Sequence, residues 1–180
     1  THGTPLYVYA QSTIERHVKV LQQALKAIPH KICYAVKANG NLGILNVLDK
    51  LGCDFDAVSG GELARLTHLG IDGQRIISSG VGKTDEEIKA ALKANVDYIC
   101  VESYAEFEAV AAQAQALGTP ARLSVRVNPN IDAKTHPYIS TGLHENKFGV
   151  PWEEAQRIYQ MGDANPWTTM VGLTCHIGSQ

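Results

Sequence analysis

Residues 75–101 read RIISSGVGKTDEEIKAALKANVDYICV, and this stretch predicts a β-α-β unit. Its two ends, RIISS and DYICV, are short apolar runs with the length and β-branched content of buried strands. Between them, Thr84-Asp85-Glu86-Glu87 has the pattern of a capping box, in which a hydroxyl and a glutamate bind free backbone N–H groups at a helix start. Strands joined through a helix pair in parallel, so the stretch predicts a parallel sheet.

The same unit repeats on both sides of this stretch. Further apolar runs begin at residues 31, 54, 122 and 170, and the first five runs follow one another every 21 to 25 residues. Ser103 to Glu106 is interpreted as a second capping box, and Gly52, Gly70 and Gly118 are placed where helices should stop. The chain is therefore expected to alternate strand and helix throughout.

An additional helix is expected before the first strand, from about Ser12 to Ile28. Its apolar face and its proline stop come from five residues: Ile14, Val18, Leu21, Leu25 and Pro29.

Two architectures have this regular alternation of strand and helix, an open doubly wound sheet and a (β/α)8 barrel. A doubly wound sheet usually shows a G-x-G-x-x-G turn after its first strand, and the sequence has none. Instead, polar residues follow the apolar runs, where a barrel builds its active site: Lys37, Asp56, Ser59, Ser78, Ser79, Glu102, Arg126, Asn128 and His176. The α/β barrel is therefore favoured. Such barrels need about 250 residues, so residues 1–180 are expected to be the N-terminal part of a barrel that is truncated after its sixth strand.

The composition excludes several classes of function. The 180 residues are 44% hydrophobic and 19% charged, which suits one soluble core and provides no membrane span. The formal net charge of −2 argues against non-specific binding of nucleic acid, because no basic excess can neutralise phosphates. The chain does not open on a secretory signal pattern, so a cytoplasmic protein with a small-molecule partner is expected.

Three features that could suggest other chemistry are interpreted as structural. Four cysteines at positions 33, 53, 100 and 175 lie beside apolar runs without a C-x-x-C pair, and buried reduced thiols are expected. The seven histidines contain no H-E-x-x-H, so no metal site is predicted. The run from Gly80 to Thr84 resembles the end of a phosphate-binding P-loop, but Ile77 stands where that motif needs a glycine.

Lys37 interrupts an apolar run, CYAVKANGN at residues 33–41. In an alternating strand, Cys33, Ala35 and Lys37 share a face, and the small residues leave space beside the lysine. A partly dry site would lower the pKa of this lysine, and a neutral amine can attack the aldehyde of pyridoxal phosphate. The spacing alone leaves a second possibility open, in which Lys37 extends from the rim into solvent or pairs with Asp56.

Five motifs then appear in a fixed order: YAVKAN at 34–39, FDAVSGGEL at 55–63, RVNP at 126–129, NKFG at 146–149 and HIGSQ at 176–180. Together they resemble the diaminopimelate decarboxylase family, of the fold type III, alanine-racemase-like pyridoxal-phosphate enzymes, from Thr4 to Gln180. Members of that family are more than twice as long. The resemblance therefore implies that the last barrel strands and a C-terminal β domain are absent from this chain.

The resemblance also implies roles for individual residues. Lys37 would be the covalent Schiff-base anchor of pyridoxal phosphate, His176 would stack on the pyridine ring, and Ser179 would bind the cofactor phosphate. The surroundings of the ring would be formed by Asp56, Glu62 and Arg126, where the buried arginine needs carboxylate partners to offset its desolvation. The connection from 128 to 150 would be a loop that covers the substrate.

The activity implied by the resemblance is decarboxylation of meso-2,6-diaminopimelate to L-lysine and CO2, the last step of lysine biosynthesis, in a homodimer. Two alternatives stay open: a related decarboxylase of another basic amino acid or polyamine precursor, and a non-catalytic homologue that only binds pyridoxal phosphate. The 180-residue chain alone is expected to be inactive or weakly folded, because an incomplete barrel exposes sheet edges and apolar faces.

Overall fold

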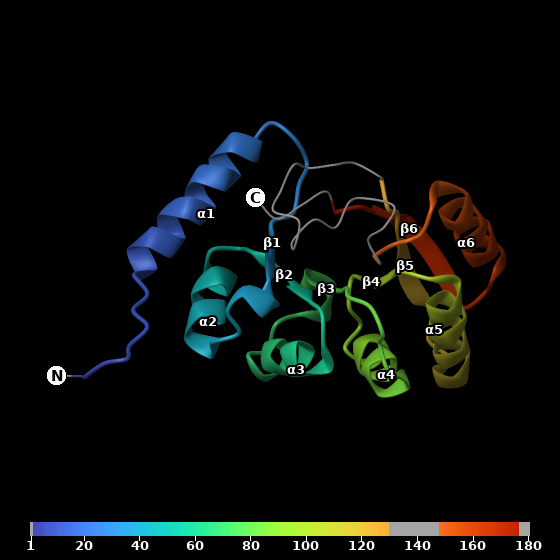
Figure 1. Ribbon diagram of the computed structural model, residues 1–180, viewed down its shortest axis with the longest axis horizontal. Helices are drawn as coiled ribbons and strands as arrows, with labels where there is room; N and C mark the ends of the chain where they lie inside the picture. The colour runs from blue at the N-terminus through green and yellow to red at the C-terminus, as the bar shows by residue number, and fades with distance from the viewer. Residues whose placement is uncertain (1, 130–147, 177–180) are drawn as a thin grey trace.

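Six parallel strands form a single sheet in this structure, a computed structural model that describes residues 2–129 and 148–176. Their order in space equals their order in the sequence (Figure 1). A doubly wound sheet reverses its strand order at a switch point, whereas a barrel does not. The sheet is therefore an incomplete barrel, and all six predicted strands are confirmed: β1 (Cys33–Ala35), β2 (Asp54–Ala57), β3 (Ile76–Ser78), β4 (Tyr98–Val101), β5 (Ala121–Arg126) and β6 (Thr168–Thr174).

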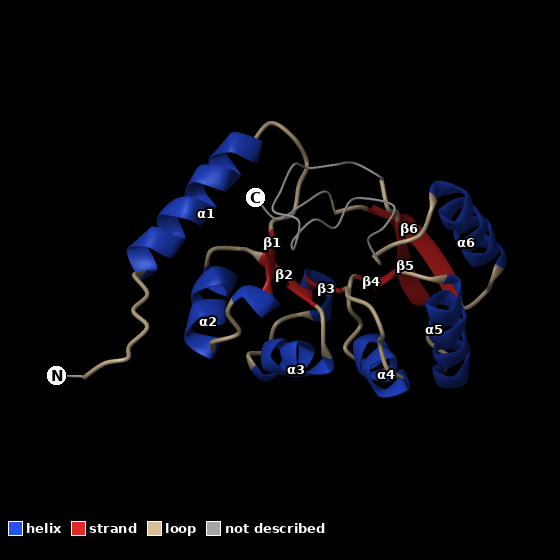
Figure 2. Ribbon diagram, viewed as in Figure 1, coloured by secondary structure: helices blue, strands red, loops and turns tan. Residues whose placement is uncertain are grey.

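The helices that join consecutive strands lie in an arc along one side of the sheet (Figure 2). They are α2 (Leu42–Lys50), α3 (Gly60–His68), α4 (Asp85–Lys93), α5 (Tyr104–Leu117) and α6 (Trp152–Ala164). The hydrophobic core fills the space between these helices and the strands, and its largest fully buried side chains include Leu45, Phe55, Leu66, Ile76, Ile88, Ile99, Leu123 and Ile158. Burial of each such side chain stabilises the fold by about 1.5–3 kcal/mol.

The predicted helix signals are confirmed in part. Thr84 and Glu87 form the capping box, with backbone-to-side-chain hydrogen bonds of 3.2 and 3.0 Å. Ser103 caps α5 through the N–H of Glu106 at 3.1 Å, but the carboxylate of Glu106 binds the N–H of Glu102 instead of closing the box. The second predicted capping box is therefore confirmed for the Ser103 side chain and wrong for the Glu106 side chain. The three predicted glycine stops are confirmed by positive φ angles of 77°, 73° and 63° at positions 52, 70 and 118.

The first helix, α1 (Gln11–Leu25), ends before the predicted Ile28 and packs mainly against α2. Val18 is its buried residue, whereas Leu21 is 45% exposed, so the predicted apolar face is only partly covered. In the part of the chain that the structure describes, none of the helices combines the length and the apolar character that a bilayer crossing requires.

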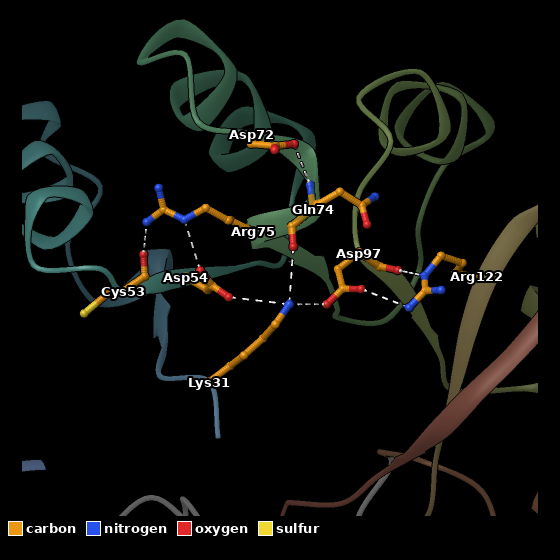
Figure 3. Close-up of polar contacts among 8 residues, drawn as sticks. All are labelled: Lys31, Cys53, Asp54, Asp72, Gln74, Arg75, Asp97 and Arg122. Carbon is orange, nitrogen blue, oxygen red and sulfur yellow. Dashed lines mark hydrogen bonds and ion pairs between the residues drawn. The ribbon is translucent and has the colours of Figure 1, made fainter. Parts of the chain in front are cut away.

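Charged side chains join the amino-terminal ends of neighbouring strands (Figure 3). Lys31 lies 2.7 Å from Asp97 and 3.6 Å from Asp54, so one ammonium contacts the starts of two strands. Asp97 also binds Arg122 at 3.2 Å, and Asp54 binds Arg75 at 3.1 Å. This end of a barrel is opposite the catalytic end, and its interactions serve stability.

Replacing Asp97 by alanine is expected to lower the free energy of unfolding of the full-length protein by about 1 kcal/mol. The effect is modest because the cations it binds, Lys31 and Arg122, are half-exposed. Urea unfolding at low salt and at about 1 M NaCl measures it, and the difference from wild type should shrink at high salt, where charges are screened. The matched control is Asp163→Ala, on the exposed end of α6. A loss that is independent of salt would contradict the ionic origin.

The hydrogen bond with Asp97 raises the pKa of Lys31. A raised lysine pKa means that the folded state holds the proton more tightly than the unfolded state does. The contribution of the pair is therefore fully present at neutral pH and is lost only as the pH rises through the raised pKa, above the usual lysine range.

Candidate active site

A cavity of about 560 Å³ lies at the carboxyl-terminal ends of the strands. All six strands, or the residues directly after them, contribute to its lining, and its polar residues include Lys37, Asp56, Ser79, Arg126, Thr174 and His176. The volume falls within the usual range for small-molecule sites. The carboxyl-terminal end of a barrel is where its catalytic residues gather, so the cavity is the candidate active site.

Lys37 reaches the cavity from a turn and not from a strand. Strand β1 ends at Ala35, and Val36–Ala38 form a short 3-10 turn, η1. The prediction that Cys33, Ala35 and Lys37 share one face of a continuous strand is therefore wrong, because strand pairing ends at Ala35. The turn buries Val36 in the core and leaves Lys37 at the cavity, which Cys33 lines as well.

The surroundings of Lys37 differ from the partly dry site expected. Its side chain is exposed in the described part of the chain, so the residues present there do not remove it from water. The alternative pairing with Asp56 is also not observed: the Asp56 carboxylate accepts a hydrogen bond from the Ser79 hydroxyl at 2.5 Å. Asp56 and Ser79 both line the cavity, so this bond ties the ends of β2 and β3 together.

His176 follows β6 and comes close to two cations of the cavity. Burial lowers the pKa of His176, and the positive charges of Arg126 and Lys37 lower it further. The imidazole is therefore neutral at physiological pH, and it presents a flat ring to its neighbours. The structure thus brings together Lys37 from the turn after β1, Arg126 from the end of β5 and His176 from the segment after β6.

Arg126 is held by Glu102, a strand-end carboxylate that was expected at the active-site end of the barrel but was given no role around the cofactor ring. Its guanidinium donates to Glu102 at 2.9 Å, and the two side chains are 16% and 2% exposed. The register pairs Val101 of β4 with Val125 of β5. Glu102 and Arg126 follow these two residues and therefore lie side by side. Arg126 therefore has the carboxylate partner that its burial requires, but this partner is Glu102 and not Asp56 or Glu62.

The same guanidinium lies over the ring of Phe148, with 5.3 Å between its carbon and the ring centroid, in a cation–π contact. The next residue, Gly149, has a φ of 77°, and a Cβ there would lie 2.9 Å from the carbonyl oxygen of Arg126. Only glycine allows the chain to pass this close. Phe148 and Gly149 of the NKFG motif therefore pack directly on the site arginine.

Glu62 does not line the cavity. It stands in the first turn of α3, where Ser59 accepts the hydrogen bond from its N–H at 3.3 Å, and its carboxylate accepts the N–H of Val58 at 2.8 Å. Glu62 thus anchors the segment that follows Asp56. Ser179 and most of the connection from 128 to 150 lie outside the described residues.

Thiols are a part of the cavity that the sequence analysis did not foresee. Cys33, Cys100 and Cys175 line it. The prediction that all four cysteines are buried is confirmed at Cys53 and Cys100, but Cys33 is only partly buried and Cys175 is exposed. Burial raises the pKa of Cys33 and of Cys100 to about 11, so both thiols stay protonated at neutral pH and are poor nucleophiles. Among the described residues, no group of three His, Cys, Asp or Glu residues could hold a metal ion.

The lining residues suit a flat, anionic cofactor that carries an aldehyde. Lys37 supplies a primary amine, His176 supplies a neutral ring that can lie against an aromatic plane, and Arg126 supplies a positive charge. Pyridoxal phosphate has these chemical features, and the volume of the cavity accommodates a molecule of its size.

Comparisons with known proteins agree with this geometry. The family described as pyridoxal-dependent decarboxylase, pyridoxal binding domain, matches residues 11–180. A diaminopimelate decarboxylase of Vibrio cholerae is 49% identical over 99% of this chain and 43% of its own length. The crystal structure of diaminopimelate decarboxylase from Helicobacter pylori complexed with L-lysine superposes with a TM-score of 0.97 at 47% identity, covering 100% of this chain and 46% of that one.

A more distant structure has the same fold. A lysine decarboxylase from Selenomonas ruminantium superposes with a TM-score of 0.81 at 28% identity, over 94% of this chain and 41% of its own. The chain spans less than half the length of these relatives. Because the family match covers all but the first ten residues, the chain belongs to the pyridoxal-binding domain family of the pyridoxal-dependent decarboxylases.

Proposed function

We propose that residues 1–180 are the N-terminal, cofactor-holding part of a (β/α)8 barrel in a diaminopimelate decarboxylase, which converts meso-2,6-diaminopimelate to L-lysine and CO2. The observation that carries the proposal is the 49% identity over 99% of the chain to a curated enzyme of that activity. It is supported by the meeting of Lys37, Arg126 and His176 at one cavity. We also propose that the full-length protein is a cytoplasmic homodimer.

The cofactor, when bound, supplies an electron sink for the electron pair left on the substrate α-carbon as CO2 departs. The residues of this chain hold and orient it. Lys37 would bind the aldehyde carbon of the cofactor through Nζ, and the same nitrogen would carry a proton. His176 would place its neutral ring against the pyridine plane, where an imidazolium would add a further charge to a site that already holds Lys37 and Arg126.

The carboxylates and the remaining polar groups would have supporting roles. Asp56, tied to Ser79, would line the side of the ring, and Glu62 would hold the segment between Asp56 and α3 in place. Arg126 would contribute a fixed positive charge, and Ser179 would bind the cofactor phosphate. Residues beyond this chain would have to supply the distal end of the substrate site.

A decarboxylase for another basic amino acid is the second candidate. It is favoured by the TM-score of 0.81 with the lysine decarboxylase of Selenomonas ruminantium, although the identity there is 28%. The two candidates have the same cofactor chemistry and differ in the group that the enzyme recognises at the far end of the substrate.

The test is CO2 release by the full-length protein, loaded with pyridoxal phosphate, from meso-diaminopimelate, L-lysine, L-ornithine and L-arginine in parallel. We expect kcat/KM for meso-diaminopimelate to exceed the others by at least about 100-fold, because a site that binds a polar distal group rejects analogues that lack it. A preference for L-lysine would support the second candidate. Cofactor binding with no CO2 from any substrate would overturn both and indicate a carrier.

A further inference from the structure

Lys83 is a buried lysine that has no role in the proposed function. It belongs to the GVGK run that resembles a P-loop, yet its side chain is only 5% exposed. Its ammonium donates to the carbonyl oxygens of Gly80 at 2.6 Å and Cys100 at 2.8 Å, and to the carboxylate of Glu106 at 2.7 Å. All three N–H donors are therefore used, which is the condition under which a buried charge is tolerated.

Two of these contacts fix the wall of the cavity directly. Gly80 and Cys100 both line it, one in the loop after β3 and the other in β4. Lys83 therefore joins two adjacent parts of the lining through their main chains. Gly80 also lies close to the residue that follows β2, since its φ is 89° and a Cβ there would lie 3.1 Å from the carbonyl oxygen of Val58.

The third contact leads to Arg126. The second carboxylate oxygen of Glu106 accepts the N–H of Glu102 at 2.7 Å, and the Glu102 side chain binds Arg126 at 2.9 Å. Lys83, Glu106, Glu102 and Arg126 thus form a continuous chain of short polar contacts. Each of these side chains is less than one-fifth exposed, so water screens these contacts only weakly.

Helix α3 offers an internal comparison. Glu62 occupies the same helix position after Ser59 as Glu106 does after Ser103, and its carboxylate also accepts the N–H of the residue before the cap, at 2.8 Å. Glu62 makes this bond without an ion pair among the described residues. The local cap therefore does not require a lysine, and helix capping alone does not account for the contact from Lys83 to Glu106.

We propose that Lys83 is a positioning residue of the cofactor cavity: it holds the rim at Gly80 and Cys100 and, through Glu106 and Glu102, it fixes Arg126. The inference rests on the proposed function, because the cavity that Lys83 shapes is the one assigned to the cofactor. Lys83 itself does not line the cavity and is not a catalytic residue.

The test is a double variant, Lys83→Met with Glu106→Gln, in the full-length protein. It removes both buried charges together and keeps an oxygen that can accept the N–H of Glu102. We expect a roughly tenfold higher Kd for pyridoxal phosphate, an altered visible circular dichroism band of the bound cofactor and a roughly tenfold lower kcat, since a displacement of about 1 Å at a site can cost up to 100-fold. The matched control, Lys93→Met on the exposed end of α4, should equal wild type.

A folded double variant with the Kd, the dichroism and the kcat of wild type overturns the proposal. If the double variant does not fold, Glu106→Gln alone decides, because it keeps both carbonyl acceptors of Lys83. A roughly threefold weaker cofactor affinity in that variant supports the proposal, and an unchanged affinity refutes it. Failure of the wild-type protein to bind pyridoxal phosphate would instead refute the proposed function, so the two failures are distinguishable.

Discussion

Lys37→Ala is expected to lower kcat for CO2 release from meso-diaminopimelate by at least about 1000-fold in the full-length protein. The variant should also lose the visible absorbance that a covalently anchored cofactor gives. The physical reason is that Lys37 is the primary amine that η1 places at the cavity beside Arg126 and His176, and only an uncharged amine can attack an aldehyde. Absorbance spectra and CO2 release at saturating cofactor measure both effects.

Two further variants test whether the loss of activity comes from the missing amine, from the missing positive charge or from a general effect of substitution on the fold. Lys37→Arg keeps a positive charge but has no nucleophilic amine at neutral pH, so it should be as inactive as Lys37→Ala. Lys19→Ala, on the exposed face of α1, should behave as wild type. Full absorbance and activity in Lys37→Ala would mean that the lysine is a solvated rim residue, which is the alternative that the sequence leaves open.

The order of strands and helices is predictable from the sequence because it depends on local patterns. Apolar runs at a regular interval, with capping and glycine stops between them, are enough to place all six strands. The end of a strand is harder to predict, because pairing with a neighbour decides it. Strand β1 ends at Ala35, which pairs with Asp56 of β2. The apolar residues that follow, Val36 and Ala38, belong to the η1 turn.

The site was predictable where a residue follows the last paired position of a strand. Glu102 and Arg126 each follow the last pair between β4 and β5, Val101 with Val125, so their contact could have been inferred from the order and register of these two strands. Glu62 shows the opposite case. The spacing from Ser59 to Glu62 is itself a helix-start pattern, and the structure uses the glutamate there rather than at the cavity wall. The exposure of Lys37 could not be predicted from composition, because it depends on which side chains lie over the cavity at the carboxyl-terminal ends of the strands.

The second large effect is expected at the buried pair of Arg126 and Glu102. Arg126→Met should lower the free energy of unfolding of the full-length protein by about 3–5 kcal/mol, because it leaves a buried carboxylate without its cation. The Glu102 side chain is 2% exposed, and its Oε2 has no hydrogen-bond partner among the described residues, so nothing nearby is placed to compensate. Urea unfolding measures the loss, with Arg157→Met on the exposed face of α6 as the matched control.

Adding Glu102→Gln to Arg126→Met separates stability from cofactor binding. The double variant has no buried charge at this position, and it should recover most of the lost stability, since neutral replacement of a buried ion pair is often tolerated. Its affinity for pyridoxal phosphate should stay about tenfold weaker or more, because a charged hydrogen-bonding partner contributes about 1.5–3 kcal/mol. Recovery of both properties would show that Arg126 serves the fold alone. Recovery of stability without affinity would assign the cation to the cofactor, in agreement with the role proposed for Arg126.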